Sequence, residues 1–502
     1  MSSQNGRAVK VVEDKAAGLG VLLAACISTL VVNANTSAVT ILLPAISEDT
    51  GSPVSTLQWA VTGYMLVGAA VIVTSGALGD VFGRRKVFLG GLLLFVASCV
   101  LIALSQQGFG VIAGRMIQGA AGSTILACGM SLLSVDSAGA GQMKAVTLWG
   151  AASAAGGAAG PLIGGLLVGA TGWQGLFWID AVIAAACIPI TLLMVAESSD
   201  PNRPRSIDWA GTILIAVILV PLVLALSEGG DWGWASLATL GCFVIAALGV
   251  VGFVLAEKRV SAPLVDLALL RNRVLVGATL AILLVAGTIN GLMYVLSLYF
   301  QDPDGFGMTA LEAGLATLPA VAVMIAITPL ITPVAVKIGS RQAVALGFLL
   351  SAIGFGALGF VKADWAYGMF VVPLVVMAIG LGLANGPASS ASTSAVRPEE
   401  VGQASGISNM ARYVGGSLAT AATATVYAAA TASHKADGFT PSESLAASLS
   451  RSAILMAVMA FAGVLLAVLM GRHQAAKARS VHRAAAAAAL AHTIPTAPVE
   501  NH

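Results

Sequence analysis

Polar side chains interrupt the first long apolar run of this chain, in the stretch LVVNANTSAVTILLP at residues 30–44. The amides of Asn33 and Asn35 and the hydroxyls of Thr36 and Thr40 can form hydrogen bonds, but they cannot exchange a proton as a carboxylate can. Polar groups at membrane depth are costly unless they face a cavity or a partner. We therefore expect these four residues to line a substrate cavity. Bonding between helices is the alternative for the two asparagines.

Charged residues inside other apolar runs are candidates for coupling chemistry. Arg115 and Gln118 occur in VIAGRMIQGAAGS, and Asp180 occurs in WQGLFWIDAVIAA. A charge in mid-membrane is seldom structural filler, so we predict a coupling or cavity role for Arg115 and Asp180. For the neutral Gln118 the same role is implied by the family resemblance described below, because Arg115 and Gln118 together match one of its motifs. For Asp180 the alternative is a hydrated position near the outer membrane surface. Arg412 is expected to pair with backbone carbonyls. Further polar residues expected to face the cavity are Asn290, Tyr294 and Asn385.

The elements that must position these residues are membrane helices. Only 10% of the 502 residues are charged and 58% are hydrophobic, whereas about a quarter of a soluble protein is charged. Apolar runs of roughly 20 residues match the thickness of a bilayer core. We predict an all-α polytopic membrane protein with spans at 18–45, 56–78, 87–105, 109–133, 145–170, 175–196, 208–227, 235–256, 274–300, 311–336, 342–361, 367–391, 402–430 and 452–471.

The distribution of basic residues supports this count of fourteen. With both termini in the cytoplasm, twenty of the 25 Lys and Arg lie on the cytoplasmic side, and three lie outside: Lys362, Lys435 and Arg451. Cytoplasmic loops of membrane proteins carry this excess of positive charge. The Ala-rich end of the chain is expected to be a surface helix or a disordered tail. All five cysteines fall in apolar runs, so neither a disulfide framework nor a metal site is expected.

The loop after the second predicted span reads GALGDVFGRRKVFLGG. A membrane-orienting turn would explain its basic residues, but neither Asp80 nor the glycine spacing. The stretch resembles the signature loop of the major facilitator superfamily. In that family the aspartate docks between two helix bundles and helps to hold the outward-facing state. The resemblance therefore implies a gating role for Asp80, Gly83, Arg84 and Arg85.

The fifth predicted span contains GGAAGPLIGG. Gly156, Gly160 and Gly164 form a small-residue stripe on which another helix can pack closely, and Pro161 removes one backbone hydrogen bond and kinks the span. Ordinary helix packing is one interpretation. The full pattern resembles the antiporter signature of drug exporters within the superfamily.

Several further stretches resemble the fourteen-helix drug:proton antiporter subfamily: SIDWAGTIL, AEKRVSAPLVDLALLRNR, LYFQ and VGQASGISNMARYVGGS. The first span of that subfamily usually reads D-x-T-I-V-N-V-A-L-P, so Asn35 stands where the acid is usual. Asp180 stands where an asparagine is usual, and Gln174 replaces an arginine. We predict that the acid lost from span 1 is compensated by the acid gained in span 6.

The resemblance implies a domain order. We expect a cytoplasmic tail, a six-helix bundle, an inserted helix pair, a second six-helix bundle and an Ala-rich cytoplasmic tail, at residues 1–17, 18–196, 197–273, 274–471 and 472–502. Two such bundles rock about a central site in alternating access.

The expected function is export of amphipathic small molecules, such as drugs, antibiotics or secondary metabolites, from a bacterial cytoplasm in exchange for protons. A facilitator or metabolite exporter without proton coupling is the alternative. The protein is expected to act as a monomer in the lipid bilayer of the inner membrane, without cofactor, metal or nucleic acid. An enzyme is not expected, because the sequence shows no metal-binding pattern, activated nucleophile or phosphate loop.

Overall fold

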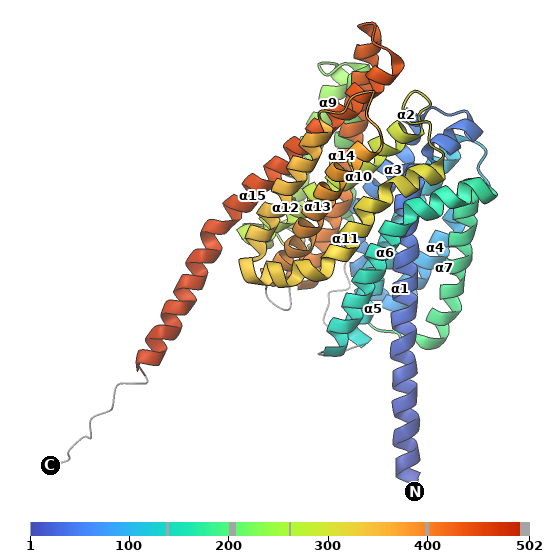
Figure 1. The fold of residues 1–502 in the computed structure, drawn as a ribbon. Helices are drawn as coiled ribbons and strands as arrows, with labels where there is room; N and C mark the ends of the chain where they lie inside the picture. The colour runs from blue at the N-terminus through green and yellow to red at the C-terminus, as the bar shows by residue number, and fades with distance from the viewer. Residues whose placement is uncertain (1, 137–139, 200–206, 261–262, 397–400, 492–502) are drawn as a thin grey trace, which may run out of the picture.

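The structure is a computed structural model, and it describes residues 2–136, 140–199, 207–260, 263–396 and 401–491. It is built of helices throughout these residues (Figure 1). The helices are α1 (Ser2–Thr50), α2 (Val54–Leu57), α3 (Trp59–Phe82), α4 (Arg84–Ala103), α5 (Gly108–Asp136), α6 (Ala140–Thr171), α7 (Gln174–Met194), α8 (Trp209–Trp232), α9 (Leu237–Glu257), the 3₁₀ helix η1 (Leu269–Arg271), α10 (Arg273–Gln301), α11 (Ala310–Ile338), α12 (Ser340–Leu358), α13 (Gly368–Ser394), α14 (Val401–Ala436) and α15 (Pro441–Ala491).

Each predicted span coincides with a long helix, so the protein is an all-α polytopic membrane protein. Eleven helices in the described residues are long and apolar enough to cross a membrane, and α6 makes a twelfth if its two parts, bent by 44°, count as one span. The count of fourteen therefore remains a prediction. α14 falls short because Ser, Thr, Asn and Gly dilute its apolar residues.

The ends of three segments differ from the predicted boundaries. α1 begins at Ser2, so residues 2–17 continue the first span as helix. The predicted outer loop at 431–451 is much shorter, because α14 continues to Ala436 and α15 begins at Pro441. A capping box starts α15, since the Thr440 backbone N–H donates to Glu443 and the Glu443 N–H donates back to the Thr440 hydroxyl. The Ala-rich tail extends α15 to Ala491, as the high helix propensity of alanine favours.

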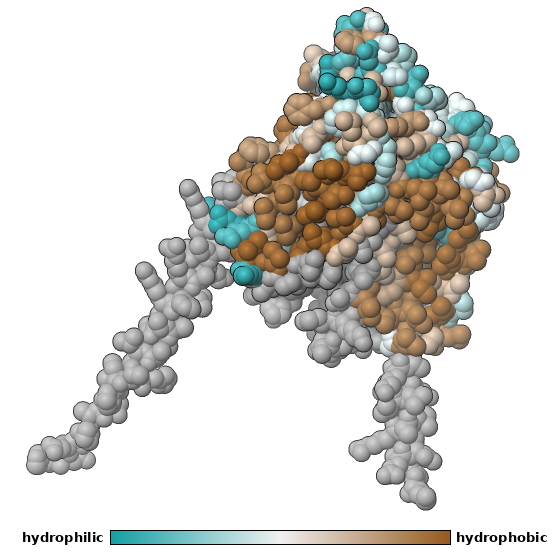
Figure 2. Space-filling model, viewed as in Figure 1, coloured by the Kyte–Doolittle hydropathy of each residue, from teal (hydrophilic) through white to brown (hydrophobic). Residues whose placement is uncertain are grey.

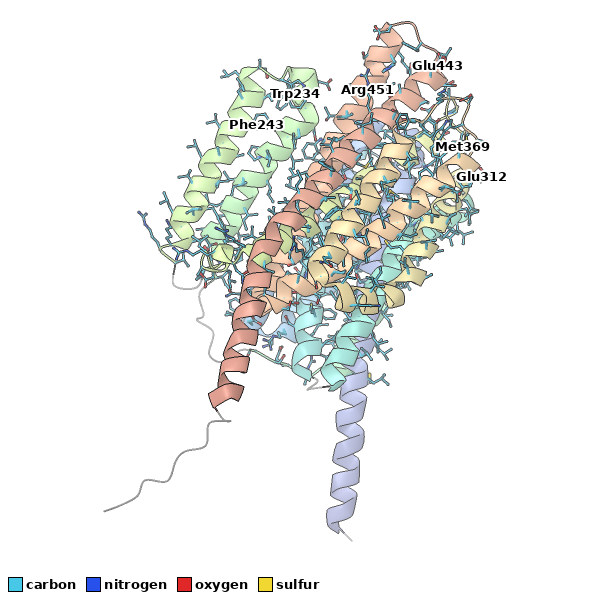
Figure 3. All side chains as sticks on the ribbon, turned by 60° about the vertical axis from the view of Figure 1, so that its left-hand side comes forward. Trp234, Phe243, Glu312, Met369, Glu443 and Arg451 are labelled. Carbon is cyan, nitrogen blue, oxygen red and sulfur yellow. The ribbon has the colours of Figure 1, made fainter. Side chains whose placement is uncertain are left out.

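Two groups of helices lie side by side, with a hairpin beside them. α1 packs on α5, α6 and α7, while α10 packs on α13, α14 and α15. The α8–α9 hairpin, which carries Trp234 and Phe243, stands at the side of the bundles (Figure 3) and contacts α3 and α14. The described surface presents broad apolar areas with hydrophilic residues above them (Figure 2). This pattern fits a protein that is surrounded by lipid.

The two groups touch where α3 packs on α14 and also at the far end, which we define as the end opposite the tails, with the turns at 51–53 and 302–309 (Figure 1). The Ser297 hydroxyl donates to the Thr40 carbonyl at 2.9 Å, and Gln301 Nε2 donates to the Ile41 carbonyl at 3.1 Å. Gly314 of α11 lies directly against the Pro161 carbonyl of α6. Because α1 and α6 belong to one group and α10 and α11 to the other, these contacts close the two groups against each other at the far end.

Candidate functional site

A buried polar network connects three helices of the first group. Asn35 of α1 donates from Nδ2 to Asp180 Oδ2 of α7 at 2.7 Å, and its Oδ1 accepts from Arg115 Nη1 of α5. The same Nη1 donates to Gln118 Oε1. Asn35, Arg115 and Gln118 are fully buried, and Asp180 is only 4% exposed. The structure thus brings together the residues for which the sequence predicted a coupling role, with one amide linking an acid to a base.

Neighbouring groups fix the orientation of Arg115. Its Nε donates to the Ala60 carbonyl at 3.0 Å, and its guanidinium carbon lies 4.2 Å from the centre of the Tyr64 ring. A cation over an aromatic face is attracted by the ring electrons. Arg115 Nη2 is buried without a hydrogen-bond partner among the described residues. Tyr64 is a site residue to which the sequence argument gave no part in this network.

Asp180 does not lie at a hydrated surface position, which was its alternative interpretation. It is buried and faces Asn35, where the usual acid of the subfamily would stand. Gln174, the other departure in the same segment, lies elsewhere: Asp49 accepts from both Trp173 Nε1, at 2.9 Å, and Gln174 Nε2, at 3.0 Å. Asp180 thus lies beside Asn35 and apart from Gln174, and a compensation between Asn35 and Asp180 remains a prediction.

The remaining polar residues of α1 are used mostly by the helix itself. Asn33 Nδ2 donates to the Thr29 carbonyl and the Thr36 hydroxyl donates to the Val32 carbonyl, and both side chains are half-buried. Thr40 is buried. Substrate contact by these residues and by Asn35 remains a prediction, and in this conformation both ends of the Asn35 amide are occupied by protein.

The second group of helices holds a separate polar cluster. Arg412 of α14 donates from Nη1 to Asn385 Oδ1 at 2.9 Å and from Nη2 to Ser389 Oγ at 2.6 Å, both on α13. Its partners are thus side-chain oxygens, and the expected pairing with backbone carbonyls is corrected. Asn290 is half-buried and donates to its own helix at Ala286, whereas Tyr294 is 3% exposed. Within the part of the chain that the structure describes, no hydrogen bond joins this cluster directly to the Asp180 network.

The glycine stripe of α6 packs on the α1 segment that carries the amides. A Cβ atom at Gly156 would lie 2.2 Å from the Leu30 carbonyl oxygen, and one at Gly160 would lie 2.4 Å from that of Ala34. Gly164 lies against Ala38 in the same way, because a Cβ atom added at Gly164 would lie 3.0 Å from the Cβ of Ala38. Pro161 lies inside α6. The stripe therefore allows α1 and α6 to approach backbone to backbone.

The loop between α3 and α4 is held by an ion pair and by the segment after α7. Arg84 Nη2 lies 2.8 Å from Asp80 Oδ1, and Arg85 Nη2 donates to the Leu192 carbonyl at 2.9 Å. Gly83 adopts a φ of 111°, which favours glycine. Its missing side chain also leaves room for Glu197, whose Oε1 accepts from the Arg85 backbone N–H at 3.1 Å. Glu197 was not anticipated, because nothing near it in the sequence marks it.

This fold and these buried charges define a multi-pass membrane transporter and not an enzyme. The profile described as Major Facilitator Superfamily matches residues 25–420, so the chain belongs to that family. It is 32% identical over 404 residues, 80% of this chain and 74% of the relative, to the tetracenomycin C resistance and export protein of Streptomyces glaucescens. It is 30% identical over 433 residues, 83% of this chain and 88% of the relative, to a cephamycin export protein of Amycolatopsis lactamdurans.

Solved structures share the fold at low sequence identity. The POT family transporter PepTSo matches with a TM-score of 0.66 at 14% identity, covering 91% of this chain and 98% of that one. A bacterial homologue of the human lysosomal transporter Spinster, in an inward-facing and unoccupied conformation, matches with a TM-score of 0.63 at 16% identity, covering 91% and 97%. These likenesses establish the fold.

Proposed function

We propose that this protein exports amphipathic small molecules from the cytoplasm in exchange for protons, by alternating access of its two helix bundles. The observation that carries the proposal is the buried connection Asp180–Asn35–Arg115. An ionisable acid at this depth is a functional group by default. Relatives named as exporters of tetracenomycin C and cephamycin support the class of cargo.

In the proposed mechanism Asp180 is the group that takes up and releases the proton. When Asp180 is ionised, its charge balances that of Arg115 through the Asn35 amide. When it is protonated, Arg115 loses this balance and favours a different arrangement of α1, α5 and α7. Tyr64 carries the effect toward the second bundle, because its ring packs on Tyr413 of α14 with centroids 6.4 Å apart.

In this proposal the protein has the domain order expected from the sequence, with a helix bundle at 18–196, an inserted helix pair at 197–273 and a second bundle at 274–471. Both termini lie in the cytoplasm of a bacterium, and the protein works as a monomer in the inner membrane. The far end, where the two groups are closed against each other, then faces the outside of the cell. Substrate is held between the bundles near Asn33, Asn290 and Asn385, and Asp80 with its loop acts as the gate.

The test is substrate-induced proton release from purified protein in liposomes. Asp180→Asn should abolish dependence of transport on the pH gradient, while substrate binding stays measurable, because an amide cannot exchange a proton. Asp364→Asn, in the far-end loop between α12 and α13, is the matched control and should leave coupling unchanged. Normal proton exchange by the Asp180 variant would refute the assignment. A wild-type protein that moves substrate with no pH dependence would favour the uncoupled facilitator.

A further inference from the structure

A second cation within the membrane helices, Arg412, distinguishes the C-terminal group. Arg412 lies inside α14, separated from the start of that helix by Val401–Ala411, or about 16 Å at the rise of an α-helix. It is only half-buried, although its hydrogen bonds direct it toward α13 and not toward lipid. A charge at this depth must face other protein groups or an internal space.

No acid balances Arg412 among the described residues. Its two partners, Asn385 Oδ1 and Ser389 Oγ, are neutral oxygens one helical turn apart. The one ion pair within the described residues joins Arg84 to Asp80, far along the chain. Arg115 shows the contrast inside the same protein, since Asn35 links it to Asp180. The neutral partners hold the Arg412 guanidinium in place and leave its positive charge uncompensated.

The surroundings of Arg412 are polar and half-exposed. Asn290 Nδ2 lies beside Gly416, one turn along α14, at 3.2 Å from a Cβ built there. Next to Arg412, Tyr413 packs on Tyr64 of the first bundle. Arg412 therefore lies next to a contact between the two bundles, and α10, α13 and α14 all contribute polar groups nearby. In the proposed transport cycle this is where cargo is held.

We propose that Arg412 recognises an anionic group of the transported molecule, a carboxylate or an ionised acidic phenol, so that the cargo is an amphipathic organic acid. A guanidinium has five N–H donors in a planar fork that matches a carboxylate with two parallel hydrogen bonds. Asn385 and Ser389 occupy two of these donors and fix the plane of the fork. This inference rests on the proposed export function.

The experiment uses pairs of amphipathic carboxylic acids and their methyl esters, with dansyl-phenylalanine and its ester as the first pair. Uptake is measured into proteoliposomes of phosphatidylcholine, so that no anionic lipid competes for Arg412. The wild-type protein should move the acid of each pair at least tenfold faster than the ester. Arg412→Gln, which keeps hydrogen bonding but removes the charge, should bring this ratio close to one without slowing the esters.

Two further variants separate recognition from structure. Arg412→Lys should retain a reduced preference for the acid, because the charge stays and the fork is lost. Arg341→Gln is the matched control. Arg341, at the start of α12, donates from Nε to the Ala467 carbonyl of α15 and takes no part in the cluster. An unchanged acid-to-ester ratio in Arg412→Gln would overturn the inference. A wild-type protein that moves esters and no acids would overturn it as well, with the exporter proposal intact. Transport of neither class would contradict both.

Discussion

At the scale of single residues, the site depends on one amide that connects an acid and a cation on different helices. Asn35 contacts Asp180 across α1 and α7, and it also contacts the Arg115 guanidinium of α5. Arg115 is therefore connected to the Asp180 carboxylate only through the Asn35 amide, whose oxygen accepts from Arg115 and whose nitrogen donates to Asp180. This arrangement predicts that the helix carrying the acid matters less than its distance from Arg115.

The reversed pair tests this directly. Asn35→Asp combined with Asp180→Asn should restore much of the proton release that Asp180→Asn alone abolishes, because a carboxylate again lies beside Arg115. Asn35→Asp alone should impair transport, since two acids in contact cannot both be ionised. Proton release per substrate is measured for the three variants and the wild type. A double variant no better than Asp180→Asn would show that coupling depends on Asp180 itself.

At the scale of elements, the contact between α1 and α6 sets the position of the amide-bearing segment. Gly160→Leu should lower transport strongly or prevent folding, because the new side chain would enter the space of the Ala34 carbonyl, 2.4 Å from its own Cβ. Gly169→Leu is the matched control on the same helix, since a Cβ there meets nothing within 4 Å. Membrane insertion and efflux are compared for both. Normal efflux in Gly160→Leu would show that α1 and α6 separate freely.

The inserted hairpin offers a test of stability at this scale. Asp208 caps α8, and its Oδ1 accepts from the Gly211 backbone N–H at 2.7 Å. Asp208→Ala should cost about 1 kcal/mol of stability, the usual cost of losing such a cap. Asp208→Asn should be at least as stable as wild type, because asparagine also caps and no longer repels the nearby Glu257 carboxylate. Thermal unfolding of detergent-purified protein measures both, and equal losses would contradict a capping role.

The elements could be predicted from the sequence much better than the site. Apolar length gave a helix for every predicted span, because a segment that crosses a bilayer must satisfy its own backbone. The contact of Asn35 with Asp180 could be anticipated only as a compensation between two unusual positions. That Gly83 accommodates Glu197, or that Arg412 bonds Asn385 and Ser389, could not be predicted, because these pairs depend on how separate helices are placed.

At the scale of the whole molecule, the loop between α3 and α4 that carries Asp80 and the contacts at the far end should both affect the equilibrium between the inward-facing and outward-facing states. The resemblance to the superfamily gives Asp80 a part in holding the outward-facing state. Asp80→Asn should therefore leave insertion intact and strongly impair transport, because the charged interaction that favours one conformation is lost. Efflux and the amount of inserted protein are measured together. Wild-type efflux rates in this variant would refute the gating role.

Substitution of Gln301 should shift the same equilibrium in the opposite direction, toward the outward-facing state. Gln301 Nε2 donates across the two groups to the Ile41 carbonyl, and to the Ser297 hydroxyl at 2.9 Å. Loss of one hydrogen bond between membrane helices costs about 0.6 kcal/mol on average, which shifts a two-state ratio about threefold. Gln301→Ala should therefore increase the population that is open at the far end.

Spin labels at Glu48 and Asp304, two exposed far-end positions on the two groups, report this opening as a larger share of long distances. Gln107→Ala is the control, because Gln107 is also exposed near that end and its side chain donates no hydrogen bond across the groups within the described residues. If Gln301→Ala leaves the distance distribution unchanged, the closed far end is held by backbone packing, such as that of Gly314 on Pro161, and a single side chain does not control the balance.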